Sequence, residues 1–218
     1  MSHLDRSGFT QAPKYLGLDD QGREVLSYIP GATTFPDDMW SGDGALIAAA
    51  TMLRRMHDAT EGFGGGSRSW AFCYPDPDQR QVICHNDFAP YNLIWRGGLP
   101  VGVIDFDLAG PGPRLRDLAY LAYWMVPLSF AAPDMVHWSR ADAAVDHRRL
   151  RLICDSYGAP CDPALLDMVS EVLHHMASPD AAADMIGPEA AKRLADDGHF
   201  RHWQCEATAF DAHRPTLL

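Results

Sequence analysis

Two short apolar segments that end in polar residues constrain the fold of this chain more than any other feature. Residues 82–95 read VICHNDFAPYNLIW, and residues 101–107 read VGVIDFD. The only two asparagines among the 218 residues, Asn86 and Asn92, both lie in the first segment. Apolar runs of this length, bounded by polar residues, are typical of short strands. We therefore expect a few short strands that present polar side chains to a functional site.

Helical patterns surround these strands. Apolar residues at helical spacing predict a helix from about Gly44 into His57, and only helical patterns follow Arg116. These later helices are expected at 116–126, about 134–157, 162–177, 188–196 and 199–213. Residues 109–113, AGPGP, are predicted to form a turn, and residues 61–69, EGFGGGSRS, a flexible loop.

The N-terminal region is expected to contain a small β-hairpin. Residues 1–9 resemble the tail of a helix, and a DDQG turn joins two predicted strands, Tyr15–Leu18 and Glu24–Ile29. Two strands alone are marginally stable, and their outer edges expose unpaired backbone groups. We expect either a homodimer formed hairpin to hairpin or packing of this segment on the helical part of the chain.

Composition excludes several classes of protein. The formal net charge of −11 argues against nucleic-acid binding, which requires basic patches. The longest nearly uncharged run, residues 118–133, is shorter than the ~20 residues that span a bilayer, and no signal peptide is visible. Five cysteines without a CxxC pair support neither a disulfide framework nor a zinc site. We expect a cytoplasmic protein without a membrane partner.

The polar residues at the strand ends are suited to phosphoryl transfer. Asp87 precedes Asn92 by five positions, and Asp105 follows thirteen positions later. A first carboxylate can orient a hydroxyl and accept its proton, while an amide oxygen and a second carboxylate can hold Mg²⁺ against nucleotide phosphates. On this interpretation Asn92 is a metal ligand, whereas Asn86 shapes the loop.

The same stretch resembles a known superfamily. CHNDFAPYN followed by IDFDLAGPGPRLRDLAY is similar to the aminoglycoside phosphotransferases and the choline/ethanolamine kinases, and the matching core covers about residues 82–122. The order of the motifs is also that of protein kinases. The resemblance implies an α+β, protein-kinase-like fold, with a mainly helical C-terminal lobe and a reduced β-hairpin N-lobe remnant.

The resemblance also implies roles for individual residues. Asp87 would be the catalytic base, Asn92 and Asp105 the Mg²⁺ ligands, and Asp107 a ligand or a support for one. His85 would support the loop, and Asp117, as an N-cap, would bind backbone amides near it. The residues expected to contact the adenine of ATP are Leu26, Tyr28, Ile29, Leu93 and Ile104. For Leu26, Leu93 and Ile104, plain core packing is an equally good interpretation.

The pattern of a complete kinase is interrupted in the N-terminal part. No Gly-rich loop precedes residue 24, and the only lysines, Lys14 and Lys192, do not match the strand lysine that contacts the phosphates. Lys14 or Arg23 could replace it, although such residues are usually solvated. Residues 1–32 are therefore interpreted as an N-lobe remnant with the hinge, and residues 33–218 as the C-lobe. Either the chain is natively reduced or its start is internal to a longer gene.

Two functional hypotheses follow. The first is an ATP- and Mg²⁺-dependent phosphotransferase that acts on a hydroxyl of an aminoglycoside-like or choline/ethanolamine-like small molecule. The second is a catalytically impaired pseudokinase that acts as a binding, immunity or resistance protein. A metal phosphohydrolase built on His57 and Asp58 is disfavoured, because further ligands at suitable positions are lacking. The aromatic residues Tyr120, Tyr123, Trp124 and Trp138 could line a pocket for a cation, but core packing is the simpler role.

Overall fold

The computed structural model describes residues 1–63, 70–131 and 143–218, and the side chains of residues 143–146 are not described. Trp138 and most of the glycine-rich loop predicted at 61–69 therefore lie outside the described residues. No helix within the described ranges is both long enough and apolar enough to cross a bilayer.

The helices carry most of the described structure. Their bounds are α1 Ser2–Arg6, α2 Gly44–Thr60, α3 Arg114–Met125, α4 Ala143–Tyr157, α5 Pro163–Met176, α6 Pro179–Ile186, α7 Pro188–Asp196 and α8 His199–His213. Short 3-10 turns occupy Pro77–Gln79, Pro90–Asn92 and Arg214–Thr216. The helices predicted from Gly44 and over 199–213 are confirmed, and the others agree within a few residues where they are described.

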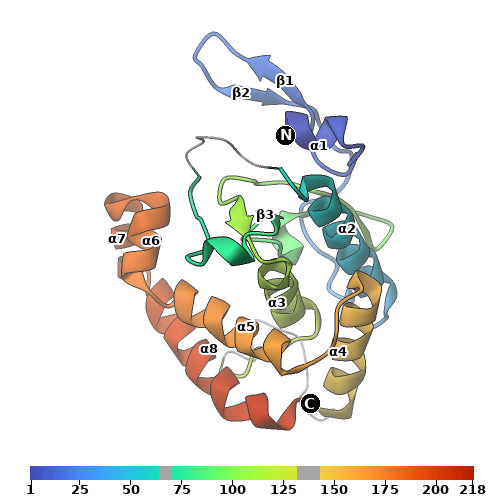
Figure 1. Cartoon of the computed structure of the whole chain (residues 1–218), viewed down its shortest axis with the longest axis vertical. Coiled ribbons are helices and arrows are strands. Elements are labelled where there is room, and N and C mark those ends of the chain that lie inside the picture. Colours follow the sequence, from blue (N-terminus) through green and yellow to red (C-terminus); the bar gives the residue numbers. More distant parts are fainter. Residues whose placement is uncertain (64–69, 132–142) are drawn as a thin grey trace.

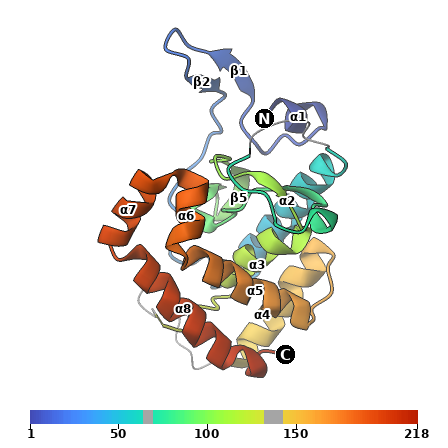
Figure 2. The same cartoon turned by 60° about the vertical axis from the view of Figure 1, so that its left-hand side comes forward.

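Helix α3 is the centre of the helical lobe. All residues from Arg116 to Met125 are buried, and a helix that is buried on every side must be surrounded by other elements. α2, α4 and α5 contact it, and α8 packs on α5 (Figures 1 and 2). α2 is instead amphipathic, and its buried face includes Leu46, Leu53 and His57.

The strands form three separate two-stranded antiparallel sheets. β1 (Tyr15–Leu18) pairs with β2 (Glu24–Leu26), β3 (Val82–Cys84) pairs with β6 (Gly110–Gly112), and β4 (Leu93–Arg96) pairs with β5 (Leu99–Val103). β3 contacts α3 and β5 contacts α2, and the polar segments of interest lie at the ends of these two sheets.

The prediction of a turn at 109–113 was wrong, because Gly110–Gly112 is strand β6. Glycine and proline suggested a turn, but here glycine permits a close approach of backbones. A Cβ atom on Gly110 would lie 1.7 Å from the carbonyl oxygen of Phe72. The strand thus depends on a neighbour that is distant in sequence, which local propensity does not report.

Helix α6 was missed by the sequence analysis. The Ser178 side chain accepts a hydrogen bond from the Ala181 N–H, and Pro179 occupies the first helical position. Gly187, with φ of +86°, ends α6, and Pro188 begins α7. The Ser-Pro start and Gly-Pro junction were available signals for a separate helix.

The architecture confirms the predicted fold class. It is an α+β chain, in which a mainly helical lobe follows a small N-terminal β-hairpin. After the hairpin, the backbone of Ala32 exchanges two hydrogen bonds with Trp95, of 2.8 and 2.9 Å, and so joins β4. Ile29 packs against Gly102 of β5. The division of the chain into an N-lobe remnant, residues 1–32, and a C-lobe, residues 33–218, stays a prediction.

The hairpin projects from the rest of the molecule (Figures 1 and 2). Within the described residues its sheet has only two strands, and β2 is shorter than the predicted Glu24–Ile29. Six apolar side chains of the hairpin and the residues directly after it are at least 39% exposed: Tyr15, Leu16, Leu18, Val25, Leu26 and Tyr28. The N-terminal segment does pack on the helical lobe through Leu4, Phe9 and Ala12, which are buried, but the hairpin itself stays exposed. The homodimer stays a prediction.

We expect the exposed hairpin to form a two-fold homodimer, because pairing would cover its apolar side chains and one free edge. Light scattering should then give twice the mass of one 24.1 kDa chain at high concentration. Leu16→Lys should shift the protein to the monomer, whereas Ile186→Lys on α6 should not. A concentration-independent mass of 24.1 kDa for the unmodified protein would contradict the dimer.

Candidate functional site

Asp87, Tyr91 and Asn92 are directly connected in the loop between β3 and β4. The Asn92 side-chain N–H donates to Asp87 Oδ2 at 2.8 Å and to the Asp87 carbonyl oxygen at 2.9 Å. The Tyr91 hydroxyl donates to Asp87 Oδ1 at 2.5 Å and lies 2.8 Å from the Tyr120 hydroxyl. Because the amide nitrogen is engaged by Asp87, the Asn92 oxygen is directed away from that carboxylate.

The two residues before Asp87 hold both ends of the 104–108 loop, which carries Asp105 and Asp107. His85 Nε2–H donates to the carbonyl oxygen of Ile104 at 2.9 Å. The Asn86 amide donates to the carbonyl oxygen of Leu108 at 2.8 Å. The structure therefore joins the Asp87 loop and the Asp105 loop into one unit, and Asn86 shapes the loop as expected.

Backbone conformation explains why short polar residues occur in these loops. Asn86 and Asp105 both have φ of +65°. Asparagine and aspartate adopt this left-handed conformation more readily than other non-glycine residues. Asp105 is exposed, and no described residue forms a hydrogen bond or ion pair with its carboxylate.

Asp117 holds the backbone of the loop between β3 and β4. Its Oδ2 accepts from the His85 N–H at 2.6 Å, and its Oδ1 accepts from the Asn86 N–H at 2.8 Å. Asp117 thus binds backbone amides as predicted, but it is not the N-cap. The N-cap is Pro113, and Asp117 lies in the first turn of α3, where its side chain reaches the backbone of the loop.

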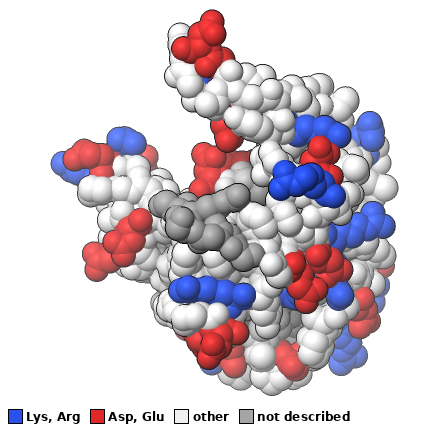
Figure 3. Space-filling view, turned by 45° about the horizontal axis from the view of Figure 1, so that its top comes forward, with Lys and Arg blue, Asp and Glu red and all other residues white. Residues whose placement is uncertain are grey.

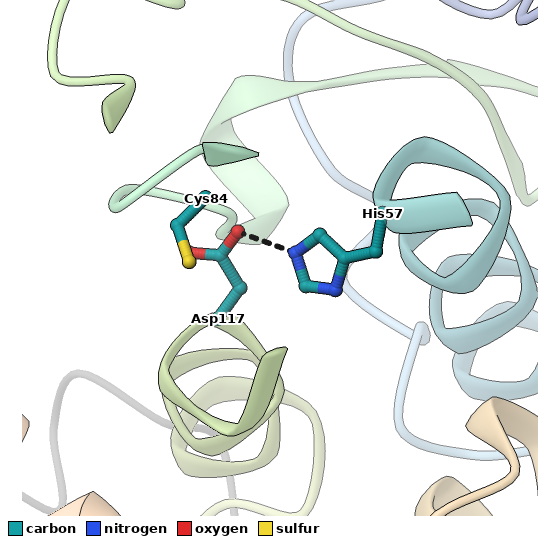
Figure 4. A group of neighbouring side chains, drawn as sticks. All are labelled: His57, Cys84 and Asp117. Atoms are coloured by element: carbon teal, nitrogen blue, oxygen red, sulfur yellow. Dashed lines mark hydrogen bonds and ion pairs between the residues drawn. The ribbon is translucent and has the colours of Figure 1, made fainter. Parts of the chain in front are cut away.

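His57 completes this support (Figure 4). Its Nε2–H donates to Asp117 Oδ2 at 3.0 Å, and its Nδ1 lies 2.6 Å from the Tyr157 hydroxyl. Both His57 and Asp117 are fully buried. Burial raises the pKa of Asp117, but the hydrogen bond and charge of His57 and the proximity of His85 outweigh burial and lower it overall.

The buried group His57, Cys84 and Asp117 offers three ligand atoms within 4.8 Å of one another, but it has no free capacity for a metal. The Asp117 oxygens accept three hydrogen bonds, and the Cys84 thiol donates to the carbonyl oxygen of Pro113 at 3.3 Å. Burial also raises the pKa of Cys84 well above its usual value, so the thiol is not a nucleophile. Asp58 pairs with Arg54 and Arg114 on the surface, which further disfavours a phosphohydrolase built on His57 and Asp58.

A cleft of about 940 Å³ lies between the N-terminal segment and the 104–109 loop. In Figure 3 the hairpin overhangs this hollow, where acidic side chains are visible. Of the residues predicted to contact a nucleotide or a metal, six line the cleft: Leu26, Tyr28, Ile29, Ile104, Asp105 and Asp107. The other two, Asn92 and Leu93, are buried and are not among the lining residues. For Leu93, which is fully buried in the core, this favours the packing interpretation.

Asp87 has an unusual electrostatic environment. Burial and the nearby charge of Asp105 raise its pKa, and they outweigh the hydrogen bonds from Tyr91 and Asn92 that lower it. A carboxylate with a raised pKa accepts a proton more readily than an ordinary surface aspartate.

The contact between Tyr91 and Asp87 was missed by the sequence analysis. A tyrosine inside the polar loop, directly before Asn92, was the available signal.

The aromatic residues that could have lined a pocket for a cation lie in the core instead. Tyr120, Tyr123 and Trp124 are at most 8% exposed and pack together. Core packing was the simpler of their two predicted roles, while Trp138 lies outside the described residues.

Comparison with known proteins relates the chain to phosphotransferases in sequence and in fold. Residues 67–153 match the model of the phosphotransferase enzyme family. The fold is similar to that of a protein from Ralstonia eutropha JMP134 assigned to the aminoglycoside phosphotransferases. The TM-score is 0.59 at 12% identity, with 95% of this chain and 81% of that chain covered.

A second solved structure has the same fold. It is a choline/ethanolamine kinase family protein from Mesorhizobium loti, with a TM-score of 0.55 at 18% identity, and 99% of this chain and 81% of that chain are covered. Both solved structures therefore show that the described chain has the kinase-like fold of these proteins, and part of the chain, residues 67–153, is similar to the phosphotransferase enzyme family.

Among curated proteins, the trifolitoxin immunity protein of Rhizobium leguminosarum bv. trifolii is 35% identical over 164 residues. The match covers 72% of this chain but only 61% of that relative, so the chain spans less than two thirds of its length.

Proposed function

We propose that this protein is an ATP- and Mg²⁺-dependent phosphotransferase that phosphorylates a hydroxyl group of a small molecule. The observation that carries the proposal is the connected unit of Asp87, Asn92 and the Asp105 loop beside a ligand-sized cleft. The proposal includes an acceptor of aminoglycoside or amino-alcohol type. It also includes a cytoplasmic location, where ATP is available.

The chemistry of the donor atoms fits Mg²⁺. Magnesium prefers oxygen ligands and usually keeps several waters in proteins. No described residue hydrogen-bonds to the Asn92 side-chain oxygen, because the amide is oriented by its nitrogen toward Asp87. Asp105 and Asp107 are exposed at the cleft and make no ion pair with the described residues. Asn92 and Asp105 would hold the ion, with Asp107 as a further ligand or support, and the ion would neutralise phosphate charge.

The proposed role of Asp87 follows from its surroundings. Its carboxylate would orient the acceptor hydroxyl and take up the proton of that hydroxyl as phosphate is transferred. The Tyr91 hydroxyl now donates to Asp87 in the way that an acceptor hydroxyl would. A substrate would therefore displace Tyr91 or bind beside it, while Asn92 keeps the carboxylate in place.

The cleft fits a nucleotide. Its volume lies within the ~300–1,000 Å³ range of small-molecule sites. Leu26, Ile29 and Ile104 provide apolar walls near the hinge, where an adenine ring could stack, and the Asp105 loop lies in the same cleft. The nucleotide would thus be bound with its phosphates toward the metal ligands.

Asp105→Asn is expected to remove the contribution of metal to stability. A ligand that binds only the folded state raises Tm by mass action, so Mg²⁺ with ATP should raise the Tm of the unmodified protein more than ATP alone. The variant should lose this metal-dependent increase, whereas Asp184→Asn on the exposed surface of α6 should retain it. Differential scanning fluorimetry measures the effect, and an undiminished increase in Asp105→Asn would remove Asp105 from the metal site.

A second candidate function is immunity by binding, without catalysis. The similarity to a trifolitoxin immunity protein favours it. The two functions differ in their dependence on Asp87, because only catalysis requires a base. If the protein protects cells from trifolitoxin, equal protection by Asp87→Asn would support the binding function, and lost protection would support phosphate transfer.

A further inference from the structure

A nucleotide in the cleft would need positive charge near its phosphates. A nucleotide brings several negative charges to a wall that already contains Glu24, Asp105 and Asp107. Mg²⁺ at Asn92 and Asp105 would offset part of this charge, but kinases of this kind also use a lysine on the phosphates. Lys192 lies on α7, which is not part of the cleft.

The two cations considered from the sequence are engaged elsewhere. The Lys14 ammonium lies 2.9 Å from Asp5, and the Arg23 guanidinium lies 2.7 Å from Asp19 at the hairpin turn. Neither residue lines the cleft.

Arg6 differs from both. It is the single lysine or arginine among the described residues that line the cleft. Its side chain is exposed, and it forms no ion pair or hydrogen bond with any other residue in the described ranges. A guanidinium group carries five donors in a planar arrangement that matches phosphate oxygens, and it stays charged at any physiological pH.

Helix α1 holds Arg6 at this position. Leu4 is buried, and His3 Nε2–H donates to the carbonyl oxygen of Ala59 at the end of α2, 2.9 Å away. The His3 ring also packs on Phe63 at 4.1 Å between ring centroids. Ser2 and His3, four and three residues before Arg6, line the cleft as well, so this helical face is directed toward it.

We propose that Arg6 binds the phosphate groups of the nucleotide. The inference rests on the proposed function, because it requires a nucleotide in the cleft. It assigns a binding role to α1 that the sequence pattern of the superfamily does not contain.

The test is direct measurement of nucleotide binding by isothermal titration calorimetry with Mg²⁺ present. Arg6→Gln should weaken the binding of ATP and ADP about tenfold or more, since a charged hydrogen bond is lost. Adenosine, which lacks phosphates, should bind the variant and the unmodified protein equally. The matched control Arg201→Gln, on the exposed surface of α8, removes the same charge and should leave ATP binding unchanged. Arg6→Lys should have an ATP affinity between those of Arg6→Gln and the unmodified protein, because lysine keeps the charge but not the planar arrangement of donors.

Four outcomes would overturn the inference. Unchanged ATP affinity in Arg6→Gln would exclude the contact, and equal losses for ATP and adenosine would show that Arg6 supports only the shape of the cleft. ATP affinity as low in Arg6→Lys as in Arg6→Gln would show that charge is not the reason. Failure of the unmodified protein to bind any nucleotide would overturn the proposed function together with the inference, and so it differs from the other three results.

Discussion

Asp87→Asn is expected to lower the rate of phosphate transfer by roughly 10²–10⁴-fold, the usual contribution of a positioned general base. The fold should be retained, because an amide can replace the carboxylate in both hydrogen bonds. Its oxygen can accept from Asn92, and its nitrogen can donate to the Tyr91 hydroxyl, which in turn can donate to Tyr120. Nucleotide affinity should change little, since the base acts on the acceptor.

This result is measured with labelled ATP and a panel of acceptors that includes aminoglycosides, choline, ethanolamine and trifolitoxin. Asp155→Asn, an exposed substitution of the same chemical type on α4, is the matched control and should retain full activity. Equal turnover by Asp87→Asn and the unmodified protein would show that Asp87 is not the base. No transfer to any acceptor by the unmodified protein would favour the binding function instead.

Asp117→Ala is expected to cost roughly 3–5 kcal/mol of unfolding free energy, as for other buried polar networks that lose one partner. The side chain accepts from His57 and from two backbone N–H groups, and all three donors would lose this acceptor, two of them in buried positions. Urea unfolding at neutral pH measures the loss, and Asp155→Ala should change stability little. A loss below about 1 kcal/mol would contradict a supporting role for this network.

The same network predicts a dependence of stability on pH. The folded-state pKa of Asp117 is lowered, so its contribution is fully present above the unfolded value near 3.9 and is lost as pH falls through the folded value. Asp117→Asn cannot ionise and should show a flatter decline of stability in acid than the unmodified protein. If the free energy of unfolding falls equally with decreasing pH in both proteins, the native Asp117 has no lowered pKa.

The resemblance of two motifs to a known superfamily was sufficient for the fold class, and local patterns in the sequence predicted single helices and the hairpin. Helical spacing predicted α8 over its full length, and the turn residues DDQG predicted the hairpin, because both signals depend on neighbours in the chain. The spacing of Asp87, Asn92 and Asp105 likewise indicated one site, since residues at the ends of short neighbouring strands meet. Their catalytic and metal-binding roles stay predictions.

Contacts between distant segments were decided only by the tertiary structure. β6 is a strand because it pairs with β3, and Gly110 lets the Phe72 backbone approach it closely. No property of AGPGP itself reports these neighbours. His57 and Asp117 are 60 residues apart, and the buried bond between them depends on how α2 packs beside α3. The position of Arg6 follows in the same way from the packing of α1 on the end of α2. Sequence patterns record the periodicity of one element, whereas these features arise from burial and hydrogen bonding between elements.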